Sequence, residues 1–135
     1  MCAKRVLEVM IKQQRGKIIN IASIWGLVGG GMFPIPAYSA TKGAIVNFTK
    51  EIALEYAELG LNINCIAPGF FSPTQLGGGL IEKDKELSKM LRSLVPAKKI
   101  GHPNDLKGTA VFLASSASDY ITGHTLVVDG GWVAK

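Results

Sequence analysis

The sequence predicts an α/β fold, with one half of a doubly wound domain built on a parallel sheet. Two observations lead to this prediction. Short runs rich in β-branched residues alternate with segments of helical periodicity, which is typical of parallel strands joined by helices. The 135 residues hold three such runs, whereas a doubly wound sheet normally has more strands. Because no linker or internal repeat separates two parts, residues 1–135 are expected to form a single partial domain.

The first half of the chain is predicted to run helix, strand, helix. "MCAKRVLEVMIKQQRG" has apolar residues at helical spacing and ends at Gly16, a residue type common just beyond helices. "KIINIAS" is rich in β-branched residues, as buried strands are. A loop rich in glycine and proline (24–37) follows. The next helix is expected over about 38–58, with acidic residues along its solvent face.

The second half is predicted to run strand, helix, helix, strand. "LNINCIA" (61–67) is a second buried strand, and Pro68 and Gly69 close it. A charged helix is expected over about 81–93, and "HPNDLKGTAVFLASSAS" has the apolar spacing of another helix. "HTLVVDGG" supplies the last strand and a glycine turn.

The composition excludes a disordered chain, because 47% of the residues are hydrophobic and 19% are charged. The net charge of +5 is modest, and lysines alternate with acidic residues in the stretch 82–89. A nucleic-acid-binding stripe keeps its basic residues unbroken and adds stacking aromatics. We therefore interpret this stretch as a solvated helix face and expect no nucleic-acid partner.

Cysteine and histidine are too sparse for a disulfide framework or a metal site. Cys2 and Cys65 lack metal-ligand spacing, and His102 and His124 are isolated in the sequence. We expect no metal and a reducing, cytoplasmic location. Glycines and prolines break the uncharged stretch within 17–42, so no membrane span is predicted, and no secretory signal is recognisable.

Candidate catalytic residues are predicted where strands end and a helix begins. Tyr38 and Lys42 are four residues apart at the start of a helix, so their side chains lean toward the same space. Ser23 ends the first strand, and Pro68 and Gly69 end the second. Open α/β sheets bind ligands at the carboxyl ends of their strands, so we expect these residues to converge there.

This combination suits proton exchange at a carbonyl oxygen. Reducing a ketone by hydride leaves an alkoxide that needs a proton, and a tyrosine hydroxyl can supply it. Because the reference pKa of a tyrosine is about 10, its use near pH 7 requires about 4 kcal/mol of preference for the phenolate. An adjacent ammonium, here Lys42, supplies much of that preference. A serine hydroxyl, here Ser23, can hold the carbonyl oxygen as charge develops on it.

Several motifs, in their order, make the chain resemble the short-chain dehydrogenase/reductase family over its whole length. They are "GKIINIAS", "AYSATKGAIVNFTKEIALE", "NINCIAPG", "PNDLKGTAVFLAS" and "ITGHTLVVDGG". The resemblance implies the C-terminal half of a doubly wound, Rossmann-like fold. It also implies an oxidoreductase that acts on CH–OH groups with NAD or NADP. Ser23 would orient the carbonyl and Tyr38 would be the acid/base, while Lys42 would support the tyrosine and bind the nicotinamide ribose.

The family pattern further implies cofactor contacts, a lid and subunit interfaces. The charged helix after the "LGGG" stretch (76–79) would cover the substrate. The helices over 38–58 and 103–117 would form the interfaces of a homo-oligomer, either a dimer or a tetramer. Thr74 comes one position later than the threonine that usually follows Pro-Gly in the family. The residues implied to contact the cofactor are Tyr38, Lys42, Pro68, Gly69, Phe71 and Thr74.

Within the family, "SIWGLVGG", "PGFFSPT" and "ASDYITGHTLVVDGGWVAK" are most similar to members acting on sugar acids, of the gluconate 5-dehydrogenase and 2-deoxygluconate 3-dehydrogenase type. This similarity implies a small-molecule substrate with a carbonyl or alcohol group, namely a small polyhydroxy acid. The 3-oxoacyl-carrier-protein reductases are the nearest competing group.

The dinucleotide-binding motifs of the family are not found in these residues. Neither its TGxxxGxG turn nor its NNAG stretch occurs, and "GLVGGG" (26–31) does not join a predicted strand directly to a helix. Three alternatives stay open. The first is an oxidoreductase represented by its C-terminal half, inactive as this chain alone. The others are a non-catalytic interaction protein and a half that folds with a separately encoded N-terminal half. An in-frame TGxxxGxG upstream of Met1 in the DNA would favour the first.

Overall fold

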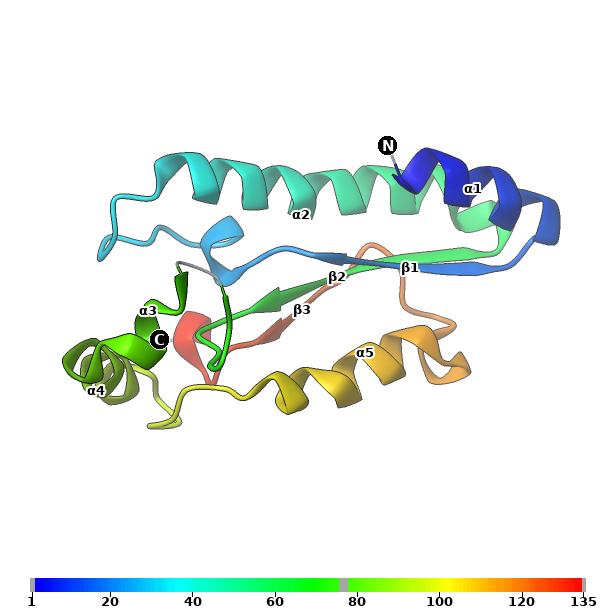
Figure 1. The fold of residues 1–135 in the computed structure, drawn as a ribbon. Coiled ribbons are helices and arrows are strands. Elements are labelled where there is room, and N and C mark those ends of the chain that lie inside the picture. The colour runs from blue at the N-terminus through cyan, green and yellow to red at the C-terminus, as the bar shows by residue number, and fades with distance from the viewer. Residues whose placement is uncertain (1, 76–77, 135) are drawn as a thin grey trace.

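Three parallel strands form the centre of the structure, which is a computed structural model that describes residues 2–75 and 78–134. The strands are β1 (Gly16–Ile21), β2 (Leu61–Pro68) and β3 (Thr125–Val128), and they lie in this order. The helices packed on the sheet are α1 (Cys2–Gln13), α2 (Pro36–Tyr56) and α5 (Lys107–Ala114). α1 and α2 cover one face of the sheet and α5 covers the other (Figure 1). The predicted α/β fold with a parallel sheet is confirmed.

β2 is the buried strand of this sheet. Its parallel pairing with β1 starts at Gly16 and Leu61, and its pairing with β3 starts at Cys65 and Thr125. The side chains of residues 63–67 are all buried. Such a run without polar alternation fits a strand covered on both faces. Among the described residues β1 pairs only with β2, which leaves the other edge of β1 without a strand.

A hydrophobic cluster joins α1 and α2 to the sheet. Leu7 of α1 packs with Ile52 and Ala53 of α2. Leu61 and Ile63 of β2 belong to the same cluster. Fully burying an aliphatic side chain of this size contributes about 1.5–3 kcal/mol. Because short helices are marginal in water, this burial is what stabilises α1 on the sheet.

Two short helices follow the carboxyl end of β2, and Figure 1 shows them beside the C-terminus. They are α3 (Leu80–Lys83) and α4 (Lys85–Leu94), where a single charged helix over 81–93 is predicted. Asp84 separates them, because its Oδ1 accepts a hydrogen bond of 2.9 Å from the Leu87 N–H and so caps α4. Leu91 of α4 and the adjacent Val95 are buried, whereas α3 has no buried residue.

The predicted end of the first helix is wrong. α1 ends at Gln13, because Gln14 adopts a φ of 50° and turns the chain toward the sheet. Gly16 instead begins β1. A Cβ atom at Gly16 would lie 2.3 Å from Sδ of Met10, so a larger residue there would force the Met10 side chain to move.

The helix predicted over 102–118 is shorter than expected. Its α-helical part is α5 alone, with one 3₁₀ helix before it (η4, Pro103–Leu106) and one after it (η5, Ser116–Ser118). The helix stops at Ser115, whose backbone is extended and whose Oγ donates to the Phe112 carbonyl at 2.9 Å. A serine side chain can satisfy the last carbonyls in this way, which competes with a further helical turn.

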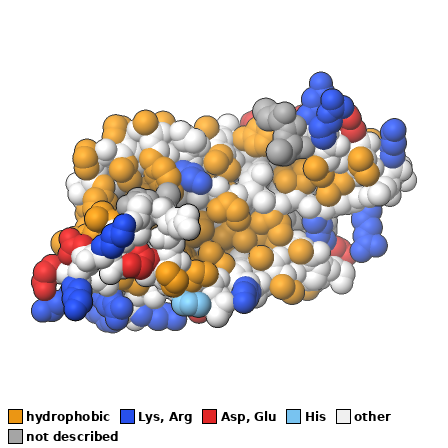
Figure 2. Space-filling view, in the orientation of Figure 1, with side chains coloured by type: hydrophobic (Ala, Val, Ile, Leu, Met, Phe, Trp, Pro, Cys, Tyr) orange, Lys and Arg blue, Asp and Glu red, His pale blue; other side chains and the backbone are white. Residues whose placement is uncertain are grey.

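Apolar and basic side chains gather in different parts of the surface. Figure 2 shows hydrophobic side chains in the middle of the view, between α2 and α5, and Lys and Arg side chains around α4. No helix within residues 2–75 and 78–134 is both long enough and apolar enough to cross a membrane.

Candidate active site

Ser23 lies just beyond the end of β1, in a buried turn. It is 6% exposed and forms the N-cap of the 3₁₀ helix η1 (Ile24–Gly26). Its Oγ accepts a hydrogen bond of 3.2 Å from the Trp25 N–H. This bond fixes the position of the oxygen and leaves the hydroxyl hydrogen able to reach another acceptor.

Tyr38 and Lys42 lie in the first turns of α2, as their spacing predicts. The Lys42 Nζ is 5.7 Å from the centroid of the Tyr38 ring. The same Nζ donates a hydrogen bond of 3.1 Å to the carbonyl of Ile21, the last residue of β1. The ammonium therefore joins the start of α2 to the carboxyl end of β1, and its positive charge lies beside the phenol.

η1 and α2 are in direct backbone contact. A Cβ atom at Gly26 would lie 2.6 Å from the backbone C and O atoms of Lys42, so a larger residue does not fit there. On the other side of the contact, a Cβ atom at Gly43 would be 3.6 Å from the Gly26 carbonyl oxygen, an ordinary contact distance. This approach brings the turn that begins at Ser23 onto the helix that carries Lys42.

An aromatic cluster packs beside these residues. The rings of Trp25, Phe70 and Trp132 are arranged edge to face, with centroid distances of 5.0–5.9 Å. Tyr38 packs against the hydrophobic cluster that contains Trp25 and Trp132. The cluster therefore joins η1, α2, the segment after β2 and the C-terminal turn. Sequence reasoning missed these three aromatics, although each follows the end of a predicted strand.

The end of β2 is held against β3. The Gly69 N–H donates to the Val128 carbonyl at 2.9 Å. A Cβ atom at Gly69 would lie 2.7 Å from the Asp129 Cβ, so this approach needs a glycine. Pro68 and Gly69 are half-buried at the carboxyl edge of the sheet, on the strand next to β1.

Phe71 and Thr74 lie farther along the same segment and make different contacts. The Phe71 ring packs on Gly101, and the two residues form a parallel bridge. Phe71 also lines a hollow of about 250 Å³ with Lys99 and Asp129. The Thr74 N–H donates to Oε1 of Glu82 at 2.7 Å. Phe70, rather than Phe71, is therefore the aromatic residue of this segment that packs in the cluster beside Tyr38.

Four titratable groups among the described residues are perturbed by their surroundings. The hydrogen bond with Glu55 raises the pKa of the Tyr56 phenol. The Thr74 N–H, followed by the Ser72 hydroxyl, holds the pKa of the Glu82 carboxyl below its usual range. The backbone N–H of His102 likewise lowers the pKa of Asp105. Burial raises the pKa of the Cys65 thiol.

Both histidines, which are isolated in the sequence, lie on the surface. His102 is exposed, and its Nδ1 accepts a hydrogen bond of 3.2 Å from the Asn104 N–H at the start of η4. His124 is also exposed. Within residues 2–75 and 78–134, no three His, Cys, Asp or Glu side chains are grouped as metal ligands would be.

Comparison with known proteins relates this arrangement to enzymes. A family model described as enoyl-(acyl carrier protein) reductase matches residues 1–133. The chain is 43% identical over 134 residues to 2-dehydro-3-deoxy-D-gluconate 5-dehydrogenase of Dickeya dadantii, covering 98% of this chain and 51% of that protein. It is 39% identical over 135 residues to the 3-oxoacyl-[acyl-carrier-protein] reductase of a Synechocystis species, covering 98% of this chain and 51% of that protein.

A solved structure of a similar protein has a closely similar fold. The crystal structure of a gluconate 5-dehydrogenase from Burkholderia cenocepacia, in complex with NADP and tartrate, matches with a TM-score of 0.91 and 40% identity. The match covers 98% of this chain and 51% of that one. The chain spans about half the length of the curated relatives it matches.

Proposed function

Since the chain belongs to the short-chain dehydrogenase/reductase family, we propose that it is part of an NAD- or NADP-dependent oxidoreductase. The reaction transfers hydride between the nicotinamide and a hydroxyl or ketone group of a small polyhydroxy acid. The observation that carries this proposal is the backbone contact of η1 with α2. This contact holds the turn of Ser23 beside the helix of Tyr38 and Lys42, at the carboxyl end of β1.

Each of these three residues has its own task in the proposed reaction. The Ser23 hydroxyl donates a hydrogen bond to the substrate oxygen as negative charge develops on it. Tyr38 gives its phenolic proton to the alkoxide in reduction and removes a proton from the alcohol in oxidation. Lys42 is the positively charged neighbour of Tyr38 in this arrangement, with its ammonium 5.7 Å from the centre of the ring.

The nicotinamide end of the cofactor fits the residues described here. When bound, the cofactor supplies or accepts the hydride. Lys42 is free of any acidic partner among the described ion pairs, so its ammonium can also bond a ribose hydroxyl. The residues that we propose to contact the cofactor are Tyr38, Lys42, Pro68, Gly69, Phe71 and Thr74.

The described residues offer no comparable binding site for the pyrophosphate end of the cofactor. The glycine-rich stretch 26–31 lies between η1 and the loop before α2, and no helix begins at its end. A pyrophosphate needs converging N–H groups at a helix N-terminus. We therefore propose that residues 1–135 are the C-terminal half of a domain whose N-terminal half carries the dinucleotide turn. The unpaired edge of β1 fits this arrangement, since it can receive a further strand.

A substrate panel tests the proposed function. Sugar acids with hydroxyl or keto groups and acyl thioester ketones are each assayed with NAD(H) and NADP(H), on a form that includes the proposed N-terminal half. We expect kcat/KM to be at least about tenfold higher for a sugar acid, which corresponds to about 1.4 kcal/mol in transition-state binding. Absence of turnover with every substrate would overturn the oxidoreductase assignment and favour the non-catalytic alternative.

A 3-oxoacyl-carrier-protein reductase is the second candidate function. The 39% identity to the Synechocystis reductase supports it. The same panel separates the two candidates, because this enzyme prefers the thioester ketones. Residues 1–135 alone are expected to bind NADH and NADPH weakly in either case, which calorimetric titration measures directly.

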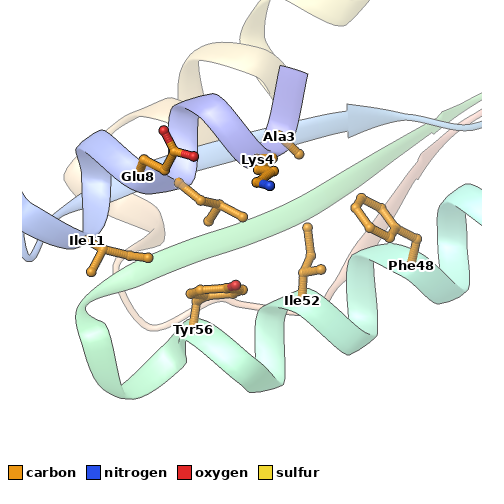
Figure 3. Close-up of a pocket in the computed structure, with 8 residues that line it drawn as sticks. Ala3, Lys4, Glu8, Ile11, Phe48, Ile52 and Tyr56 are labelled. Carbon is orange, nitrogen blue, oxygen red and sulfur yellow. The ribbon is translucent and has the colours of Figure 1, made fainter. Parts of the chain in front are cut away.

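We also propose that the protein is a cytoplasmic homo-oligomer. Leu54 on α2 is 76% exposed and Val111 on α5 is 67% exposed, so both helices present apolar side chains to solvent. A hollow of about 310 Å³ lies between α1 and α2. Figure 3 shows Phe48, Ile52 and Tyr56 along its α2 side. We propose that a second copy of the chain packs against the surface formed by α1 and α2.

Charge complementarity supports a second copy as the occupant. The exposed charged side chains of α1 are mostly basic, and those along α2 and the turn after it are mostly acidic, with Lys50 as the exception, so two antiparallel copies would pair mainly unlike charges. Replacing Leu54 by Glu should reduce the molar mass measured by light scattering, and an unchanged mass would contradict this interface. The charged residues concerned are Lys4, Arg5, Lys12, Glu51, Glu55 and Glu58.

A further inference from the structure

One carboxylate oxygen of Glu82 accepts two hydrogen bonds from a turn earlier in the chain. Its Oε1 accepts from the Ser72 hydroxyl at 2.9 Å and from the Thr74 N–H at 2.7 Å. Two donors that converge on one charged oxygen make bonds stronger than those between neutral groups. The sequence predicts only a solvated helix face over 82–89, so this contact is visible in the structure alone.

No fully buried side chain anchors α3, although Ile81 is half-buried. The helix has no buried residue, and Leu80 at its start is 50% exposed. Lys83 donates to the carbonyl of Gly78, which is a contact within the same turn and not with the rest of the molecule. α4, in contrast, is anchored through the buried Leu91. The hydrogen bonds of Glu82 thus tie α3 to the segment after β2.

That segment is itself fixed on its other side. The Ser72 N–H donates to the Gly101 carbonyl, and the Gly101 N–H donates to the Phe70 carbonyl, both at 2.9 Å. Phe70 also belongs to the aromatic cluster beside Tyr38. Residues 70–74 thus form a bridge with one side on the candidate active site and the other on Glu82.

We propose that Glu82 is a positioning residue that fixes α3 and α4 against residues 70–74. Residues 70–74 follow Pro68 and Gly69, so the contact sets how the two helices cover the end of β2. Its bearing on turnover rests on the proposed function, whereas the contact itself does not. Lys83 is the one cation that acts on the Glu82 carboxyl among the described residues, and it favours the charged form.

Hydrogen exchange of three variants in the full 135-residue chain tests this proposal. In Glu82→Ala the amides of Ser72, Thr74 and 80–83 should exchange about tenfold faster, as the loss of a charged acceptor predicts. Glu82→Gln keeps an acceptor without the charge and should give a smaller increase. Glu86→Ala is the matched control in the same charged stretch and should change these rates by less than about twofold.

The strand β2 serves as the internal reference for this experiment. Its amides over 61–67 should exchange equally in wild type and variants. Unchanged exchange of the Ser72 and Thr74 amides in Glu82→Ala would overturn the proposal, and so would a lack of protection of these amides in the wild type. Equal acceleration in β2 would also overturn it, because the role of Glu82 would then be to support the whole fold.

A pH titration separates positioning by the carboxylate from a general structural role. The Thr74 amide proton resonance should follow the protonation of Glu82, with a midpoint below the ordinary glutamate value of about 4.3. The resonance should stop titrating in this range in Glu82→Gln. A Thr74 resonance that ignores pH, or that titrates alike in both proteins, would overturn the proposal. Neither measurement involves turnover, so a failure of the proposed function would be seen separately in the substrate panel.

Discussion

The two sides of the candidate active site are held together by opposite means. On the side of α2, Gly26 brings η1 onto the backbone of Lys42, and Trp25 is buried in an aromatic cluster. On the other side, α3 itself has no buried residue, and the exposed carboxylate of Glu82 connects it to residues 72–74. Close-packed contacts fix distances, while exposed polar contacts open at low free-energy cost. The residues proposed for proton transfer therefore lie on the rigid side, and the helices proposed to cover the substrate lie on the other.

The largest effect is expected from Tyr38→Phe, which removes the proton-transferring group from the rigid side. Because no other residue is proposed to exchange this proton, kcat should fall at least about 100-fold in a catalytically complete form of the protein. Dinucleotide affinity, measured by calorimetry, should stay nearly the same, since the ring and its packing remain. A variant that keeps more than about a tenth of the wild-type kcat would remove Tyr38 from this role.

Trp25→Ala breaks the aromatic cluster that supports the rigid side. Trp25 is 8% exposed and lies edge to face with both Phe70 and Trp132. Its truncation should lower the free energy of unfolding by about 3–5 kcal/mol, as for other buried aromatics. Urea denaturation measures the loss. Tyr120 is fully exposed, so Tyr120→Ala serves as the control and should change stability by less than about 0.5 kcal/mol.

Gly26→Ala and Gly43→Ala test the backbone contact from its two sides. The added methyl at Gly26 would lie 2.6 Å from the backbone of Lys42, so η1 must move and stability should fall by about 1–3 kcal/mol. The methyl at Gly43 meets the nearest atom at 3.6 Å, and alanine is favoured within a helix, so this variant should gain up to about 1 kcal/mol. Thermal unfolding compares the two. Equal changes in stability for the two variants would mean that η1 and α2 are farther apart than these distances indicate.

Local patterns account for what the sequence predicts well. The Tyr38 and Lys42 pair follows from a four-residue helical spacing, and the strands follow from short β-branched runs. Ser23 is predicted at the end of the first strand because it closes such a run, and it lies two residues beyond the end of β1. In each case the information lies within a few residues of the site it describes, so no knowledge of distant contacts is needed.

Contacts between distant segments account for what the sequence does not predict. Trp25 and Trp132 meet across almost the whole chain, and neither position has a local pattern that indicates the other. Glu82 has the sequence context of a solvated helix face, yet its two donors lie in a turn that only the tertiary fold brings near. The end of α1 was missed for a related reason, because Gln14 takes a positive φ that nothing in its residue type requires.

The smallest effect is expected from Asp84→Ala, a change on the side of α3 and α4. Asp84 Oδ1 accepts from the Leu87 N–H at 2.9 Å and is exposed, so its loss removes one cap and no packing. Helix caps of this kind contribute about 1 kcal/mol. Because α4 is anchored through Leu91 farther along, the loss should appear as faster exchange of the first amides of α4. Asp84→Asn keeps a capping oxygen and should behave like the wild type. If Asp84→Ala also made β2 less stable, α3 and α4 would unfold together with the rigid side as one unit. That result would contradict the proposed difference in stability between the two sides of the candidate active site.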